Sequence, residues 1–192
     1  MRFSFFREYG AMNSTPVFDA FERSLLDAGH TVLGDDMHSD VAVIWSVLWN
    51  GRMVGNKPIW EYFQKTGRNV IVLEVGGIKR GTTWKVGLNG INRDAYFGSN
   101  NNNSDRHRLL GLSLKPWRTD GEYILICGQH DKSLQWQGMP RMSNWVMNTI
   151  EEIQTYTDMP IVFRPHPRCP LPAIEHQYKN VYRDNPQKLS NT

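Results

Sequence analysis

Along the first 75 residues, short apolar runs alternate with longer stretches in which apolar side chains recur at helical spacing. The apolar runs predict four strands, at residues 3–6, 31–33, 41–45 and 69–74, and β-branched residues dominate the last of them. Two amphipathic helices are predicted between these runs, at residues 15–28 and 58–64. Strand and helix signals that alternate in this way favour an α/β domain with a parallel sheet.

The predicted helix boundaries agree with known capping preferences. Ser14 and Thr15 precede Pro16, and Ser or Thr caps followed by Pro in the first turn are typical helix starts. Gly29 and Gly67 follow the two helices, where glycine commonly ends a helix. Each helix therefore fits between two strands as part of a βαβ unit.

Between residues 76 and 103 the alternation of strand and helix signals ends, and Gly, Asn and aromatic residues are frequent. Asn100 to Asn103 form a polar run that predicts an exposed loop. Residues 115–121, Lys-Pro-Trp-Arg-Thr-Asp-Gly, indicate a linker, because Pro and Asp-Gly commonly mark turns. Strand and helix signals then resume, with strands predicted at 123–127, 160–163 and 178–182, a helix at 143–156 and a turn at 184–187.

This restart predicts two α/β units. Residues 1–115 form an N-terminal Rossmann-like domain, 116–121 a linker, and 122–192 the beginning of a second Rossmann-like lobe. A complete second lobe would need further strands and helices to bury both faces of its sheet. Two interpretations follow: the natural chain is longer, or the small lobe packs onto the first lobe or onto a neighbouring subunit.

Composition narrows the class of protein. Forty per cent of the residues are apolar, which excludes intrinsic disorder. A formal charge of +3 is too small for a polybasic nucleic-acid binder, whereas a pI near 8.9 suits anionic small ligands. The sequence has no apolar run long enough to span a membrane, and its first residues are too short an apolar stretch for a signal peptide. We therefore expect a cytoplasmic protein, with Cys127 and Cys169 as reduced, buried or half-buried thiols.

The sharpest chemical signal is Arg164-Pro165-His166-Pro167-Arg168, directly after a predicted strand. The two prolines stiffen the backbone around the imidazole, and arginine and histidine side chains are good donors to a phosphate. The alternative is a stiff surface turn with solvated arginines. A second signal is Gly128-Gln129 after the strand 123–127, where glycine lets a ligand approach the backbone. Because these loops follow parallel strands, they should emerge at one edge of the sheet.

Candidate residues of the first region are acidic or basic. Glu74 ends a predicted buried strand, where a carboxylate needs a partner, and Lys79 or Arg80 would supply it. The group would either line a cleft or form a structural ion pair. Glu8 and Asp36 follow predicted strands and would serve as a catalytic base for an acceptor hydroxyl if burial raised a carboxyl pKa. The alternative is a cap or a solvated charge.

Several other chemistries lack a signal. The remaining histidines show no metal-ligand spacing, and the sequence has neither a Gly-x-Ser-x-Gly elbow nor a Walker-type phosphate loop. We therefore predict no metal site.

The ordered motifs resemble a known family. Glu74-Val75-Gly76-Gly77, Lys79-Arg80 and Gly90-Ile91-Asn92 resemble the first lobe of capsular polysaccharide biosynthesis proteins. The stretch from Tyr123 to Arg168 is similar to the second lobe of those proteins, and to bacterial polysialyltransferases and glycerophosphotransferases that share a His-Pro motif.

This resemblance implies a GT-B glycosyltransferase fold and a nucleotide-sugar donor, with no obligatory cofactor or divalent metal. His166 would contact the donor phosphate, supported by Arg164 and Arg168, with Gly128 and Gln129 nearby. The acceptor would be a polysaccharide or another hydroxyl, and a nucleic acid only as a modified base. The alternatives from other classes are a non-catalytic nucleotide-binding protein and a structural homo-oligomer.

Overall fold

The computed structural model describes residues 1–98 and 105–184. The predicted asparagine loop at 100–103 and residues 185–187 of the last predicted turn lie outside the described residues. Contacts divide the chain into two compact units, one made of Met1–Ser99 with Lys132–Gln137 and the other of Asn100–Asp131 with Gly138–Thr192. Each unit has its own sheet, and each is an α/β arrangement.

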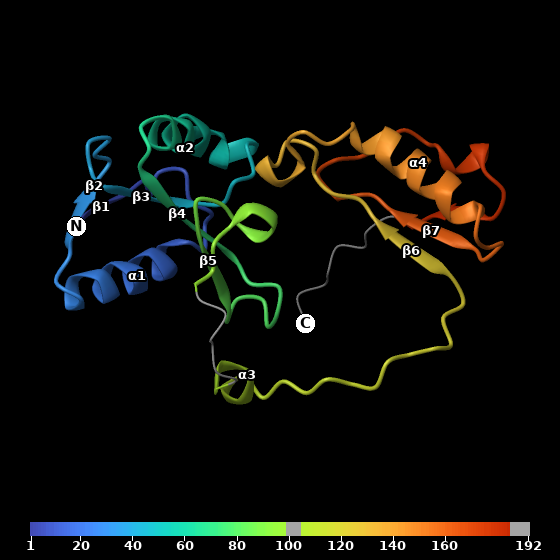
Figure 1. Ribbon diagram of the computed structural model, residues 1–192, viewed down its shortest axis with the longest axis horizontal. Helices are drawn as coiled ribbons and strands as arrows, with labels where there is room; N and C mark the ends of the chain where they lie inside the picture. Colours follow the sequence, from blue (N-terminus) through green and yellow to red (C-terminus); the bar gives the residue numbers. More distant parts are fainter. Residues whose placement is uncertain (99–104, 185–192) are drawn as a thin grey trace. The chain divides into compact units, whose positions relative to one another are not determined.

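The first unit is built on a five-stranded sheet. Its strands are β1 (Arg2–Phe5), β2 (Thr31–Gly34), β3 (Val41–Trp45), β4 (Asn69–Val75) and β5 (Trp84–Leu88), in the spatial order β2-β1-β3-β4-β5. The first four strands are parallel, and β5 is antiparallel to β4. Helices α1 (Thr15–Asp27) and α2 (Asn56–Lys65) lie on opposite faces of the sheet, as Figure 1 shows.

Strand β3 explains why this sheet needs two covering helices. All five of its residues are buried. Since alternate side chains point to opposite faces of a sheet, both faces of β3 must be covered. Val41, Val43 and Trp45 pack with Phe18 of α1, whereas the intervening residues pack in a second core with Phe63 of α2. A run of apolar residues without alternation is the signature of a parallel strand buried on both faces.

The strand β5 is a difference from the sequence prediction. Residues 76–103 were expected to be irregular, yet Trp84–Leu88 pair with β4. The strand lies at the sheet edge, contains Lys85 and Gly87, and is buried only at Gly87. Edge strands of this kind carry little apolar signal because one side of the strand faces solvent.

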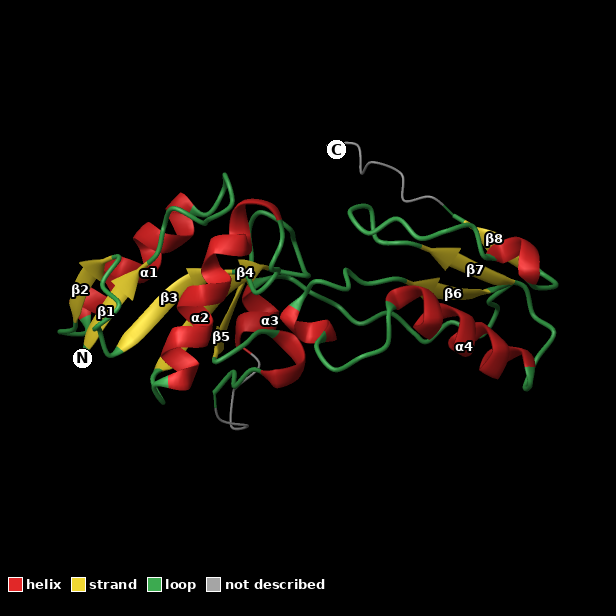
Figure 2. Cartoon of the chain, turned by 90° about the horizontal axis from the view of Figure 1, so that it is seen from above, coloured by secondary structure: helices red, strands yellow, loops and turns green. Residues whose placement is uncertain are grey.

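The second unit has a three-stranded parallel sheet in the order β6-β7-β8. Its elements are α3 (Asp105–Leu109), β6 (Ile124–Cys127), α4 (Met142–Gln154), β7 (Ile161–Arg164) and β8 (Val181–Arg183). Figure 2 shows α4 running beside β6. Ile161 and Phe163 are fully buried, whereas Leu125 and Tyr182, which flank Val162 in register, are exposed. One face of this sheet is thus packed and the other is open among the described residues.

Short 3-10 helices occupy the connections, at Gly51–Gly55, Asn92–Asp94, Leu134–Trp136 and Glu175–Gln177. The predicted linker 116–121 is irregular and exposed throughout. The unit boundary differs from the expected one, however, because residues 132–137 belong to the first unit. Leu134 is buried in the core that includes Phe63, so a segment from the second half of the sequence completes the packing of the first.

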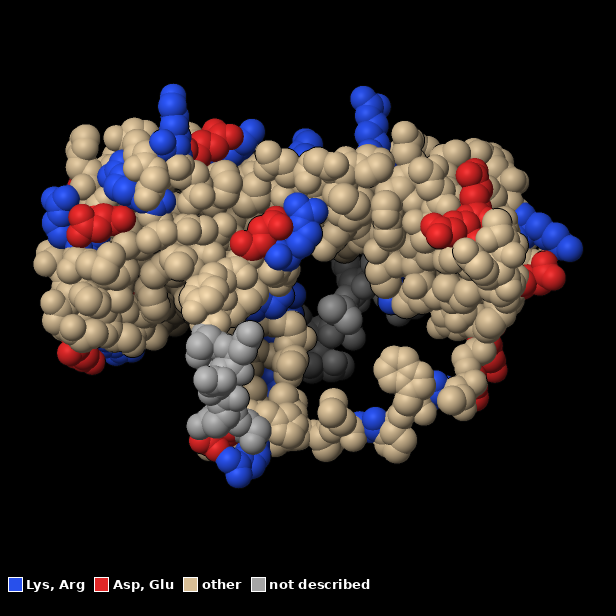
Figure 3. Space-filling model, viewed as in Figure 1, with Lys and Arg blue, Asp and Glu red and all other residues tan. Residues whose placement is uncertain are grey.

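The distribution of charge and the character of the helices bear on function. Figure 3 shows Lys and Arg side chains interspersed with Asp and Glu over the visible face, in keeping with the small net charge. Within residues 1–98 and 105–184, none of the helices combines the length and the apolar character needed to cross a membrane.

Candidate functional site

The carboxyl ends of β6 and β7 meet at one edge of the second sheet. Cys127 pairs with Arg164 in parallel register, and Gly128 N–H donates to the Arg164 carbonyl at 2.8 Å, which extends the ladder by one residue. A β-carbon at position 128 would lie 3.4 Å from His166 N and from Pro165 Cα. The expected proximity of Gly128 and His166 is therefore confirmed, and the distance is one that a residue with a β-carbon would also tolerate.

The His166 imidazole is half-buried and held by its own turn. The Arg168 backbone N–H donates to His166 Nδ1 at 3.1 Å, and the Cys169 N–H donates to the His166 carbonyl at 2.9 Å. Because Nδ1 accepts a hydrogen bond, the proton of the neutral ring resides on Nε2. His166 thus presents an N–H donor from its Nε2 side.

The surroundings of His166 favour its neutral form. Burial lowers the pKa of His166 below its ordinary value of 6.5, and the nearby charges of His130 and Arg168 lower it further. The His130 ring lies edge-on to the His166 ring, with centroids 5.4 Å apart. At neutral pH His166 is accordingly a hydrogen-bond donor without a charge, and any positive charge at this turn comes from elsewhere.

The two arginines of the motif have different environments. Arg164 Nε donates to Asp184 Oδ2 at 2.8 Å, and Arg164 Nη2 donates to the same oxygen, so this guanidinium already has a carboxylate partner. The ion pair raises the pKa of Arg164 through the hydrogen bond and the charge of Asp184. The Arg168 side chain is exposed, and no carboxylate pairs with it among the described residues. Arg168 is therefore the better candidate to meet an anion.

Gln129, the other residue predicted near the motif, is exposed. Its Oε1 accepts a hydrogen bond from the His130 N–H at 3.3 Å. The side chain thus supports the turn after β6.

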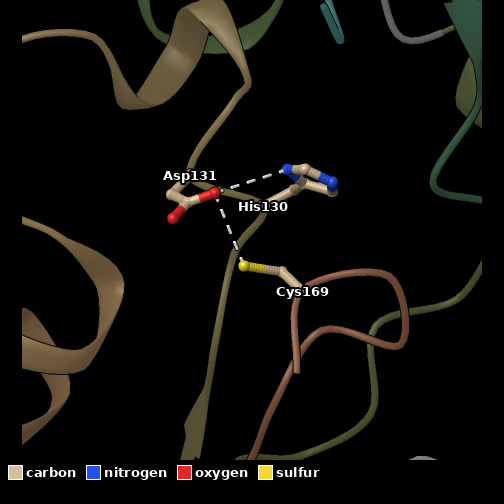
Figure 4. A group of neighbouring side chains, drawn as sticks. All are labelled: His130, Asp131 and Cys169. Carbon is tan, nitrogen blue, oxygen red and sulfur yellow. Dashed lines mark hydrogen bonds and ion pairs between the residues drawn. The ribbon is translucent and has the colours of Figure 1, made fainter. Parts of the chain in front are cut away.

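Three side chains that the sequence reasoning did not connect lie together beside this turn. The ligand atoms of His130, Asp131 and Cys169 all lie within 4.8 Å of one another, as Figure 4 shows. Asp131 Oδ1 lies between the other two, 3.8 Å from His130 Nδ1 and 3.5 Å from Cys169 Sγ. Sequence spacing gave no signal for this cluster, because Cys169 is 38 positions from Asp131.

The cysteines agree only in part with expectation. Neither Cys127 nor Cys169 forms a disulfide, which confirms the prediction that they are not bonded to each other. Cys169 is 9% exposed, as expected for a buried thiol. Cys127 was expected to be buried or half-buried but is exposed, because it ends β6 on the open face of the sheet.

The two acidic residues proposed as acceptor-side bases belong to the first unit. Glu8 is exposed, so the burial on which its catalytic role depended is not present. Asp36 closes a turn: its Oδ1 accepts from the His38 N–H at 2.8 Å, and its own N–H donates to Ser4 Oγ at 2.6 Å. Asp36 therefore already has a structural role.

Glu74, Lys79 and Arg80 also lie in the first unit. Glu74 is half-buried on β4, opposite Lys85 of β5, and its Oε1 accepts from the Val75 N–H at 2.7 Å. Lys79 and Arg80 are exposed in the turn between β4 and β5. The register thus places Lys85, which the sequence reasoning had not considered, beside Glu74, because β5 itself was missed.

These residues can be summarised by their chemistry. The edge formed by β6 and β7 carries a neutral imidazole donor, an exposed guanidinium and a glycine, and beside them a His-Asp-Cys cluster. Any assignment of function depends on this geometry, because comparisons with protein-family models, with curated proteins and with solved structures find no match to the chain.

Proposed function

We propose that this chain binds the phosphate groups of a nucleotide-sugar at the carboxyl ends of β6 and β7, as the donor-binding part of a GT-B-like glycosyltransferase. The observation that carries the proposal is the meeting of Gly128 with the turn that presents His166. In open parallel sheets, ligands collect at the carboxyl ends of the strands. The resemblance of the Arg-Pro-His-Pro-Arg stretch to His-Pro transferases supports the same class of ligand.

The hydrogen-bonding state of His166 fits this role. A neutral imidazole with its proton on Nε2 donates one hydrogen bond to a phosphate oxygen. Arg168 adds the positive charge, since its side chain is exposed, while Arg164 orders the strand end through Asp184.

A second candidate is nucleotide binding without transfer. Exposed Glu8 and turn-bound Asp36 favour it, because neither carboxylate lies in the buried environment that the proposed catalytic role required. Transfer then requires a base other than these two residues. The two candidates share the phosphate site and differ in turnover.

The donor is identified by thermal shift with UDP-, CDP-, CMP- and GDP-linked sugars, because a ligand that binds only the folded state raises its stability. Calorimetry with the best donor then compares His166→Ala with the unaltered chain. We expect a loss of about 1.5–3 kcal/mol in binding free energy, the range for a hydrogen bond to a charged group. Arg168→Met should weaken binding as well.

His176→Ala and Arg141→Met are matched controls, since both residues are exposed in the same unit and lie outside the site. Unchanged affinity in His166→Ala would contradict the phosphate site. Release of free nucleotide from the bound donor, in the presence of a polysaccharide acceptor, separates transferase from binding protein.

A further inference from the structure

The cluster of His130, Asp131 and Cys169 has the composition of a transition-metal site. It offers one imidazole nitrogen, one carboxylate oxygen and one sulfur. His130 is 4% exposed and Cys169 is 9% exposed, whereas the Asp131 side chain is 41% exposed. Two ligands are thus fixed in the protein interior, and the third is at the surface, where an ion can enter.

Two of the three distances between ligand atoms are close to those that a tetrahedral ion imposes, and the third, between His130 and Cys169, is at most 4.8 Å. Bonds of about 2.3 Å to sulfur and about 2.0–2.1 Å to nitrogen or oxygen separate tetrahedral ligand atoms by about 3.3–3.6 Å. Cys169 Sγ and Asp131 Oδ1 are 3.5 Å apart, within this range. His130 Nδ1 and Asp131 Oδ1 are 3.8 Å apart, so a movement of about half an ångström brings them into it.

We propose that His130, Asp131 and Cys169 bind a single Zn²⁺ ion. Sulfur and imidazole ligands favour zinc over magnesium or calcium, which take oxygen ligands. On coordination the Cys169 thiol gives its proton to solvent and binds as a thiolate, and the imidazole binds in its neutral form. Three protein ligands leave the fourth tetrahedral position to water or to an oxygen of a bound ligand.

This ion would join the two loops that form the edge of the sheet. His130 and Asp131 follow β6, whereas Cys169 lies in the turn after β7. The Cys169 N–H donates to the His166 carbonyl at 2.9 Å, and these two residues form an isolated antiparallel bridge. Zinc at Cys169 would therefore order the turn that carries His166.

The test uses the untagged full chain, because a histidine tag would itself bind metal. Titration with Zn²⁺ by calorimetry should show one ion per chain. Co²⁺ should give a thiolate-to-cobalt charge-transfer band in the near ultraviolet, which reports sulfur ligation directly. These two measurements need no variant and therefore do not depend on whether a variant folds.

Cys169→Ser should abolish the charge-transfer band, and Cys127→Ser should leave it intact, since Cys127 lies on the open face of the sheet. Asp131→Ala changes an exposed side chain and should weaken Zn²⁺ binding about 100-fold or more, because outer-shell partners alone change metal affinity about 10–100-fold. Asp158→Ala is its exposed control.

The proposal is overturned if the unaltered chain binds no Zn²⁺ at one-to-one stoichiometry, if the Co²⁺ complex lacks the band, or if Cys127→Ser removes it. His166→Ala should bind Zn²⁺ as the unaltered chain does, while it binds the nucleotide more weakly. The metal site and the proposed phosphate site therefore fail independently.

Discussion

At the scale of single residues, the second unit is held by charged side chains that bond to more than one segment. Arg183 of β8 donates to Glu175 through Nε at 3.0 Å and through Nη2 at 2.9 Å. It also donates to the carbonyls of Leu171 and Pro172. This one guanidinium thus ties β8 to the segment that follows the His166 turn.

The Glu175 to Arg183 pair makes stability depend on pH. The hydrogen bonds from Arg183 lower the pKa of Glu175 from its ordinary value of 4.5 to about 2. Because the folded pKa is the lower one, the stabilisation is complete above about pH 5 and is lost as the pH falls from about 4.5 towards about 2. Glu175→Gln should cost about 1–2 kcal/mol at pH 7, since the pair retains some contact with water.

This prediction is checked by hydrogen exchange of the β7 and β8 amides between pH 7 and pH 3. The difference between Glu175→Gln and the unaltered chain should shrink on acidification. Glu152→Gln, at an exposed position on α4, provides the control. A cost that stays constant down to pH 3 would show that the charge of Glu175 is not what stabilises the unit.

At the scale of elements, Asn89 joins β4, β5 and α2. Its Oδ1 accepts from the Val70 N–H at 2.8 Å and from Gln64 Nε2 at 3.0 Å, and its Nδ2 donates to Asn69 Oδ1 at 2.9 Å. Its φ angle is +57°, a left-handed conformation that asparagine tolerates better than most residues. The residue combines a backbone turn with three side-chain bonds.

Two substitutions at Asn89 separate these contributions. Asn89→Ala loses the bonds and strains the backbone, and should cost about 2–4 kcal/mol. Asn89→Gly loses the same bonds without the strain, so it should cost about 1 kcal/mol less. Chemical denaturation monitored through exchange of the β4 amides measures both. Equal costs would show that the left-handed conformation contributes nothing.

Strands with uninterrupted apolar runs were predictable from the sequence, and the edge strand without such a run was not. The expected bounds of β3 match the observed ones, β4 extends one residue further, and β7 is shifted by one residue, because uninterrupted apolar runs mark strands. The edge strand β5 was missed for the opposite reason.

The candidate site likewise has features that the sequence predicts and features that it does not. The approach of Gly128 to His166 follows from strand order alone, since loops after parallel strands emerge at one edge. The pairing of Arg164 with Asp184 and the position of Cys169 beside Asp131 depend on the path of two irregular loops. No local pattern encodes those contacts, so the cluster of His130, Asp131 and Cys169 was not predicted.

At the scale of the whole molecule, the order of residues in the sequence differs from their division into units. Leu134 follows β6 in sequence but is buried in the first unit, 9% exposed. Its neighbour Ser133 bridges to Leu48, and Gln135 accepts a hydrogen bond from Asn92 at 2.7 Å. The first unit therefore lacks part of its packing without residues 132–137.

Leu134→Ala should destabilise the first unit by about 2 kcal/mol, near the lower end for burial-losing substitutions of leucine. Hydrogen exchange should accelerate at the β3 and β4 amides and stay unchanged at β7. Leu125→Ala, on the open face of the second sheet, is the matched control. If Leu134→Ala accelerates exchange at β7 alone, Leu134 stabilises the second unit and the prediction is wrong.

The discontinuous first unit also sets an order of events during synthesis. Residues 1–98 leave the ribosome well before residues 132–137, so the core around Phe63 remains without Leu134 while the exposed linker and β6 are being made. The last packing step of the N-terminal half then waits for a segment that emerges after the first strand of the other unit. A chain arrested between these two points would expose the apolar surface that Leu134 covers, until residues 132–137 leave the ribosome and pack against it.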